Sequence, residues 1–328
     1  MAEPAPSVPE TFRRFAEDFE KGGSPLYARL AREHADDPVV AEICGDRRPR
    51  WELPLRLFGG VHYLALSGQV PDAWDSFGAT LRTHREWLTS FVAEQPIQTN
   101  EVQRSWGLLP AFLSVADGRP VDLIELGPSA GLNLLWDRYR YVYGDAAWGD
   151  PAAPLELTGD CDGCPRPELF DRTVNVRGRI GIDRTPVDLR SDESVLLLAS
   201  FVWADQEHRL ARLRAAIEVA RKDPPHIVAG DYVRELPRLL AERDTEALTI
   251  VFHSVSLAYL ARDERDRLLA AIAEDGVRGS LVHVSFEFDE EDRRAYEGFG
   301  LDVQVFPDGE PVRLARLDGH ANRLRWSA

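Results

Sequence analysis

Lysine is almost absent from this chain of 328 residues, in which it occurs only at Lys21 and Lys222. Arginine therefore carries nearly all the positive charge, and the formal net charge is −16 at pH 7. A protein that binds a nucleic-acid duplex needs a basic surface to neutralise the phosphates. The acidic balance argues against a nucleic-acid partner and favours a small molecule.

Cysteine and long apolar runs are also scarce. Three cysteines are too few for a disulfide framework in a chain of this size. Cys161 and Cys164 form a lone C-x-x-C without the four ligands of a structural zinc site, and we interpret them as two incidental thiols in a turn. The start of the chain lacks the features of a signal peptide, and the apolar runs fall short of the roughly 18 residues of a membrane span. We therefore expect a soluble, cytoplasmic protein with no metal site and no membrane contact.

Residues 11–116 have helical periodicity and almost no strand signal. Ser24 followed by Pro25 is typical of a helix start. From this periodicity we expect about six helices, in an N-terminal lid domain that spans about 1–118.

After Pro120 the pattern changes to strands that alternate with amphipathic helices. Strands are expected at 121–126, 175–182, 226–230, 248–253 and 280–288, and helices at 205–221 (capped by Asp205), 233–243 and 261–274. Alternation of this kind predicts a parallel sheet with right-handed crossovers. The segment 137–172 is interpreted as a hairpin-like insertion, 289–294 as a solvated helix start, and the last strands as antiparallel. The expected fold of 119–328 is an α/β, Rossmann-like methyltransferase domain with an antiparallel C-terminal hairpin.

The stretch "VDLIELGPSAGLNLLW" (121–136) fits two kinds of site. Gly127, Ser129 and Gly131 spell G-x-S-x-G, which is typical of the nucleophile elbow of a serine hydrolase. An elbow normally follows several earlier strands, whereas this strand is the first of its sheet. A hydrolase that uses Ser129 stays open as an alternative.

The same turn also fits a cofactor site. Glu125 ends the first strand, and Gly127 and Gly131 would let the backbone approach a nucleotide-type ligand. Glu125 would face the positively charged amino-acid part of the ligand. Ser129 would cap the following helix or donate to the cofactor. A turn that has lost its ligand is the third possibility.

Polar residues at the later strand ends support the cofactor interpretation. Asp183 ends the second strand, where an acid would bind ribose hydroxyls, and Asp231 ends the third, where it would accept from an adenine amino group. His253 and Ser254 end the fourth, where substrate chemistry is expected, because ligands bind at the carboxyl ends of parallel strands. Each residue alone fits an N-cap or a loop polar group nearly as well.

Several segments together resemble a bacterial family, domain of unknown function 2332, over most of the chain. They are "TNEVQRS" (99–105), "ELGPSAGLNLLWDRY" (125–139), "RIGIDRTPVD" (179–188), "FVWADQEHRLARLRAA" (201–216), "VAGD" (228–231) and "VFHSVSLAYL" (251–260). The resemblance implies a fold similar to class I S-adenosylmethionine-dependent methyltransferases, with no settled reaction. The chain departs from the family pattern at Ala204, where a proline is usual, and at Gly319-His320-Ala321, where Pro-His-Gly is usual. The second departure includes the residues on both sides of His320.

The leading hypothesis is methyl transfer from S-adenosylmethionine to a small polar acceptor, with His253 as the first candidate base and His320 as the second. The alternatives are the serine hydrolase and a non-catalytic protein that binds an adenosyl ligand. Four further residues are candidates for substrate binding, each with a purely structural alternative: Arg104 (a surface salt bridge), Asn133 (a helix surface), Trp203 and Gln206 (capping and packing). The sequence leaves the oligomeric state open.

Overall fold

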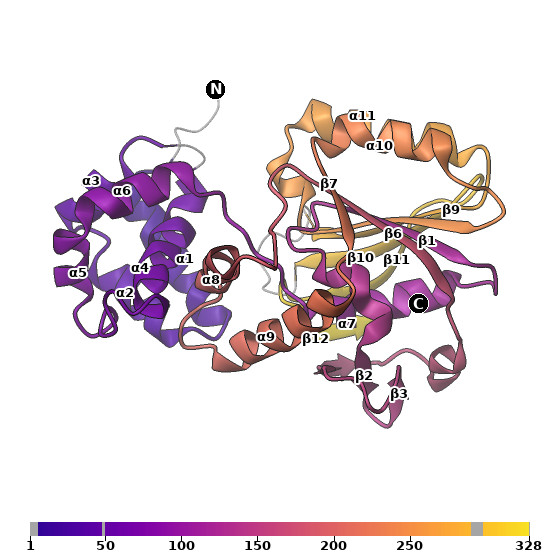
Figure 1. Cartoon of the computed structure of the whole chain (residues 1–328), viewed down its shortest axis with the longest axis horizontal. Helices are drawn as coiled ribbons and strands as arrows, with labels where there is room; N and C mark the ends of the chain where they lie inside the picture. Colours follow the sequence, from indigo (N-terminus) through magenta and orange to yellow (C-terminus); the bar gives the residue numbers. More distant parts are fainter. Residues whose placement is uncertain (1–5, 48–49, 290–297, 328) are drawn as a thin grey trace. The chain divides into compact units, whose positions relative to one another are not determined.

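The chain divides into two compact units in the computed structural model, which describes residues 6–47, 50–289 and 298–327. We call them the helical unit (Met1–Thr99 and Asp188–Leu213) and the sheet unit (Asn100–Val187 and Arg214–Ala328) (Figure 1). This division differs from the predicted boundary at 118. Helix α7 (Arg104–Val115) belongs to the sheet unit, and α8 (Asp192–Ser200) belongs to the helical unit.

The helical unit packs amphipathic helices around an aromatic core. Besides α8, its helices are α1 (Val8–Lys21), α2 (Pro25–Glu33), α3 (Pro38–Cys44), the short 3-10 helix η1 (Arg50–Glu52), α4 (Leu53–Leu66), α5 (Phe77–Thr83) and α6 (Arg85–Glu94). Phe19 and Tyr27 meet edge to face with ring centroids 5.4 Å apart, and both are fully buried. Ser24 caps α2 as predicted, because its side chain accepts from Tyr27 N. No helix in the described part of the chain has both the length and the apolar character that crossing a bilayer demands.

The segment before α9 (Glu207–Lys222) is held within the helical unit by specific contacts. Trp203 packs edge to face against Phe19, with ring centroids 5.1 Å apart, and Gln206 Nε2 donates to Gly22 O at 2.6 Å. Asp205 accepts from Ser24 Oγ at 2.6 Å and from Leu26 N at 3.0 Å. Asp205 therefore caps α2, which is distant in sequence, whereas the sequence suggested that it caps its own helix.

The sheet unit is built on nine strands of the described chain, which form one mostly parallel sheet in the order β5-β12-β11-β10-β9-β8-β1-β6-β7. The strands are β1 (Val121–Leu126), β5 (Asp160–Asp162), β6 (Val176–Asp183), β7 (His226–Ala229), β8 (Leu248–Ser254), β9 (Leu281–Phe288), β10 (Phe299–Val305), β11 (Val312–Leu317) and β12 (Arg323–Trp326). From β7 to β9 all neighbours are parallel, and β9 to β12 are antiparallel. The predicted α/β class and the antiparallel end are confirmed. The helix start expected at 289–294 lies, beyond Asp289, outside the described residues.

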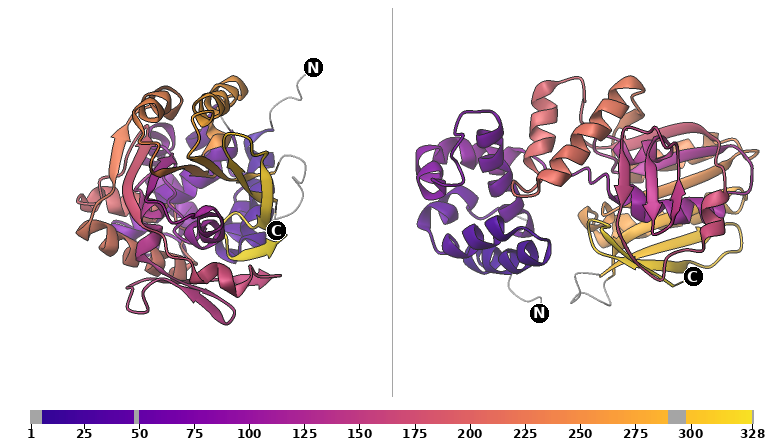
Figure 2. Two further views of the ribbon diagram at one scale, coloured as in Figure 1. Left: turned by 90° about the vertical axis from the view of Figure 1, so that its right-hand side faces the viewer. Right: turned by 90° about the horizontal axis from the view of Figure 1, so that it is seen from below.

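Helices cover both faces of this sheet. The neighbouring helices α10 (Tyr232–Glu242) and α11 (Arg262–Gly276) lie on one face, and α7 lies on the other (Figures 1 and 2). Side chains alternate between the two faces along a strand. Val251 therefore packs into the core under α10 and α11, whereas Phe252 packs against Phe112 of α7, with ring centroids 5.1 Å apart. The same alternation decides which face each candidate residue reaches.

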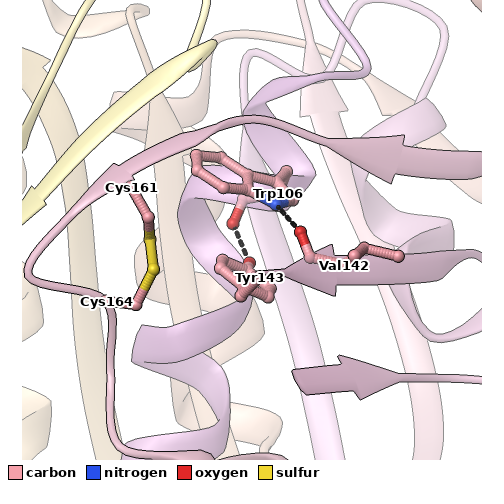
Figure 3. Close-up of a disulfide and its surroundings, with 5 residues drawn as sticks. All are labelled: Trp106, Val142, Tyr143, Cys161 and Cys164. Carbon is pink, nitrogen blue, oxygen red and sulfur yellow. Dashed lines mark hydrogen bonds between the residues drawn. A yellow bond between two sulfur atoms is a disulfide. The ribbon is translucent and has the colours of Figure 1, made fainter. Parts of the chain in front are cut away.

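The insertion forms a small sheet of its own, in the order β3-β2-β4, from β2 (Arg140–Tyr143), β3 (Ala146–Trp148) and β4 (Glu156–Thr158). Figure 3 shows how it is fixed to α7: Trp106 Nε1 donates to Val142 O at 2.9 Å, and the Tyr143 hydroxyl donates to Trp106 O. A disulfide joins Cys161 to Cys164. The interpretation of these residues as two incidental thiols is therefore wrong.

Removal of the long-range cap should destabilise the helical unit. We expect Asp205→Ala to lower its free energy of unfolding by about 1–2 kcal/mol, because the first turn of α2 loses its carboxylate acceptor. Urea unfolding would measure the loss. Asp36→Ala, which breaks an exposed ion pair with Arg13, is the control and should have a much smaller effect. Equal losses in the two variants would contradict the capping role.

Candidate functional site

The candidate site lies where the strand order changes direction. β1 is the first strand of the parallel part, and it pairs with β6 on one side and with β8 on the other. In open α/β sheets the carboxyl ends of strands at such a switch point form the crevice in which ligands bind. Glu125, Asp183 and Ser254 all stand near this edge, as the sequence predicted.

Glu125 is the most unusual group at the switch point. It is 1% exposed, and its Oε2 has no hydrogen-bond partner in the described structure. It points to the α7 face, because its register partner on β8 is Phe252. Burial and then the charge of Asp183 raise the pKa of Glu125 to about 8, while a hydrogen bond from Asn133 and the charge of Arg104 act in the opposite direction. The carboxyl is therefore mainly protonated at neutral pH.

Arg104 and Asn133, both predicted to bind substrate, lie near Glu125. Arg104 donates through Nη1 to Ser254 O at 3.1 Å and through Nε to Gly319 O at 3.2 Å, so its guanidinium lies at the carboxyl end of β8. Asn133 is buried, and its Oδ1 accepts from Ser105 Oγ at 2.7 Å. The structure thus brings Arg104 and Asn133 to Glu125, but leaves Trp203 and Gln206 in the helical unit.

The two glycines of the glycine-rich turn pack closely against other residues of the chain. A Cβ added to Gly127 would stand 2.8 Å from Ser256 Cβ, and one added to Gly131 would stand 2.6 Å from Pro225 Cγ. Both glycines have left-handed backbone angles, with φ +73° and +74°. Their small size is thus already needed for close packing and backbone geometry within the chain.

Ser129 also has a left-handed backbone, with φ +55°, which is uncommon for a residue with a side chain. Its N–H donates to Asp183 Oδ2 at 2.8 Å. The helix that follows, η2 (Leu132–Arg138), is a 3-10 helix whose N-cap is Gly131 without a side-chain bond. Ser129 therefore does not cap it.

Asp183 and Asp231 stand at neighbouring strand ends, and both bind groups of the chain. Asp183 accepts from Thr185 N at 2.9 Å in addition to Ser129 N. Asp231 is the N-cap of α10, where it accepts from Val233 N at 2.9 Å, and it also pairs with Arg184 at 3.1 Å. The N-cap alternative for Asp231 therefore describes a contact that the structure contains.

The structure separates the two candidate bases. His253 is fully buried on the α10–α11 face, opposite to Glu125; its Nδ1 lies 2.7 Å from Glu287 Oε1 and its Nε2 lies 2.9 Å from His283 Nε2. His320 lies between β11 and β12, with its N–H donating to Asp318 Oδ1 at 2.8 Å. It follows Gly319, whose carbonyl accepts from Arg104. Each histidine adjoins a residue whose carbonyl accepts from Arg104, but the ring of His253 is held on the opposite face by Glu287 and His283.

His283 and Glu287 were not among the site residues predicted from the sequence. Burial, and then the charge of His253, lower the pKa of His283 to about 3, so this ring is neutral at physiological pH. A signal was present: His283, Ser285 and Glu287 alternate with buried apolar residues along β9. A strand that is buried on both faces usually carries apolar residues on each of them, so three polar residues on one face indicate a possible site.

Comparisons with known proteins identify a family and no activity. A family model described as "Uncharacterized protein conserved in bacteria (DUF2332)" matches residues 9–326. A search of curated proteins found no match. In the part of the chain that the structure describes, no three His, Cys, Asp or Glu side chains are grouped so that they could hold a metal ion.

The buried carboxyl of Glu125 should make stability depend on pH. The folded protein holds this proton up to about pH 8, whereas the unfolded chain releases it near pH 4.5. The folded state thus binds more protons between these values, and wild-type stability falls as the pH rises through this window. We expect Glu125→Gln, which is neutral throughout, to gain on the order of 3 kcal/mol relative to wild type between pH 5 and pH 8. Urea unfolding at both pH values tests this, and an unchanged difference between the two proteins would contradict it.

Proposed function

Since the chain belongs to DUF2332, an uncharacterised family conserved in bacteria, its function has to be inferred from its site, and we propose that it transfers a methyl group from S-adenosylmethionine to a small polar acceptor. We place the cofactor at the carboxyl ends of β1, β6 and β7, on a Rossmann-like methyltransferase fold. The observation that carries the proposal is the unpartnered Oε2 of Glu125. A buried carboxyl oxygen without a partner is costly, and a cationic ligand group would satisfy it.

The surrounding residues fit the two ends of such a cofactor. Glu125 would accept from the ammonium of its amino-acid part, with Asn133 beside it. Asp183 would accept from ribose hydroxyls, because each of its oxygens keeps a lone pair beyond the one backbone bond that it accepts. Asp231 stands at the next strand end, where the adenine would lie. The two glycines add nothing to this support, since the space beside them is filled by Ser256 and Pro225.

The cofactor supplies an activated methyl group bound to a sulfonium sulfur. The chain has to orient the acceptor in line with that bond and, where the acceptor carries a proton, remove it. We assign proton removal to His320, because its loop is joined through Gly319 to Arg104 beside Glu125. His253 is less suitable, since both its ring nitrogens contact other side chains on the opposite face of the sheet.

A serine hydrolase remains the second candidate, favoured by the left-handed backbone of Ser129. Its weakness is the histidine, because His253 is engaged by Glu287 and His283 on the other face. Labelling by a fluorophosphonate that disappears in Ser129→Ala would promote this function above methyl transfer.

Binding of S-adenosylmethionine should release a proton near neutral pH. A cation placed beside Glu125 lowers the pKa of this carboxyl from about 8, so that up to about one proton leaves at pH 7. Calorimetric titration in two buffers of different ionisation enthalpy measures the proton count. We expect micromolar binding with proton release in the wild type, and weaker binding without release in Glu125→Gln. Glu242→Gln, at an exposed position of α10, is the matched control and should behave as wild type.

The same titration with S-adenosylhomocysteine should show the same proton release, because it shares the amino-acid part. Absence of both heat and a thermal shift with either compound would refute the cofactor assignment. Once an acceptor is supplied from fractionated bacterial metabolites, His320→Asn should slow formation of S-adenosylhomocysteine without weakening cofactor binding. Tight binding without turnover on any fraction would leave an adenosyl-binding protein in place of an enzyme.

A further inference from the structure

A groove of about 620 Å³ opens on the α11 face of the sheet, opposite to Glu125. This volume is within the usual range of small-molecule pockets, roughly 300–1,000 Å³. Its polar floor includes His283, Ser285 and Glu287 of β9, and α11 and β10 form its walls. The groove therefore does not share the proposed cofactor site and does not depend on it.

Three side chains form a hydrogen-bonded chain that ends in this groove. Glu287 Oε1 contacts His253 Nδ1 at 2.7 Å, and His253 Nε2 contacts His283 Nε2 at 2.9 Å. When the ring of His253 carries a single proton, its contact with the carboxylate places that proton on Nδ1, which leaves Nε2 of His253 as an acceptor. His283 must then carry its own proton on Nε2. The remaining lone pair, on His283 Nδ1, has no partner in the described part of the chain.

Glu287 presents a second acceptor. Its Oε1 receives Ser256 N at 2.9 Å and Leu257 N at 3.1 Å in addition to the His253 ring. These donors hold the carboxylate in place, and within residues 6–47, 50–289 and 298–327 no hydrogen bond reaches Oε2. Neither this oxygen nor His283 Nδ1 is sealed in the core, so a ligand in the groove can reach both. The floor of the groove thus offers one neutral and one anionic acceptor, both rigidly positioned.

Several side chains along the walls of the groove are apolar. Ile272 and Phe306 are buried beside it, whereas Leu269 of α11 and Phe288 of β9 are 37% and 38% exposed. Large apolar side chains that stay this exposed at the rim of a groove gain from a ligand that covers them. A ligand that satisfies the groove needs an apolar body as well as a donor group.

We propose that this groove binds a small amine with an apolar body, whose ammonium donates to Glu287 Oε2 and His283 Nδ1. The pairing of a cation with a carboxylate is the strong, charge-assisted part of the contact. Among the described residues, two others that are charged line the groove. Asp302 is neutralised by a bidentate contact with Arg313, and Arg265 donates to Leu257 O at the opposite wall. The positive charge of Arg265 would favour an anionic ligand, so an anion is the alternative that has to be tested against the amine.

The test uses three probes with the same apolar body and different charge: 2-phenylethylamine, 2-phenylethanol and 3-phenylpropionate. Titration of the full chain at pH 7, by calorimetry and by NMR of the histidine ring nitrogens, should show binding of the amine and at least about tenfold weaker binding of the alcohol. The amine should also shift the unprotonated Nδ1 signal of His283. Glu287→Gln keeps an oxygen for the backbone donors but removes the charge, so it should weaken the amine about tenfold or more and leave the alcohol unchanged.

Asp263→Asn is the matched control, because it removes one negative charge from an exposed side chain of α11. It should change the affinity for the amine less than about twofold, since exposed charges are screened by salt. Tighter binding of 3-phenylpropionate would overturn the proposal in favour of an anion site at Arg265. Equal binding of amine and alcohol, or equal effects of the two substitutions, would also overturn it. Should Glu287→Gln fail to fold, the His283 signal of the wild type decides alone, and no shift with the amine refutes the site.

Discussion

The pairing of β1 with β8 sets the chemistry of the whole sheet unit. Its register places Glu125 beside Phe252 and Ile124 beside Val251, so the two strands send alternate residues to α7 and to the α10–α11 layer. Neighbouring residues at one strand end consequently reach different sites. His253 faces Glu287 and His283, while the carbonyl of Ser254 accepts from Arg104 on the Glu125 side. A shift of one residue in this register would exchange the two sets of groups.

The carboxyl groups on the two faces of the sheet, Glu125 and Glu287, have different surroundings. Glu125 is buried, one of its oxygens has no partner, and Asp183 lies nearby. Burial and the charge of Asp183 raise the pKa of this carboxyl, so that it stays protonated. Glu287 Oε1 instead accepts from two backbone N–H groups and contacts the imidazole of His253. The first arrangement is poised to change protonation when a cation arrives, whereas the second holds its carboxyl group in a fixed position. Both fit cationic ligands, but for different physical reasons.

The sequence predicts the elements of the sheet unit well and the partners of its polar groups poorly. The bounds of β1 follow from a short apolar run, and Ser24 marks the start of α2, because both signals are local. The partners are long-range: Asp205 caps a helix 179 residues away at Leu26, and Gly127 is needed because Ser256 packs against it. Periodicity also shows that His253 and Ser254 face opposite ways, but not which helix covers each face. That depends on how α7, α10 and α11 pack, which no local pattern contains.

The loop after β8 connects the two faces physically. Ser256 presents its Cβ to Gly127 in the glycine-rich turn, while its N–H donates to Glu287 and its carbonyl accepts from the Tyr232 hydroxyl at 3.1 Å. Val255, just before it, has a left-handed backbone with φ +55°, which a β-branched residue adopts only when its surroundings impose it. Any displacement of the Glu287 carboxylate must therefore move Ser256 or break its bond. The turn beside Glu125 can tolerate little such movement, since Gly127 leaves no free space there.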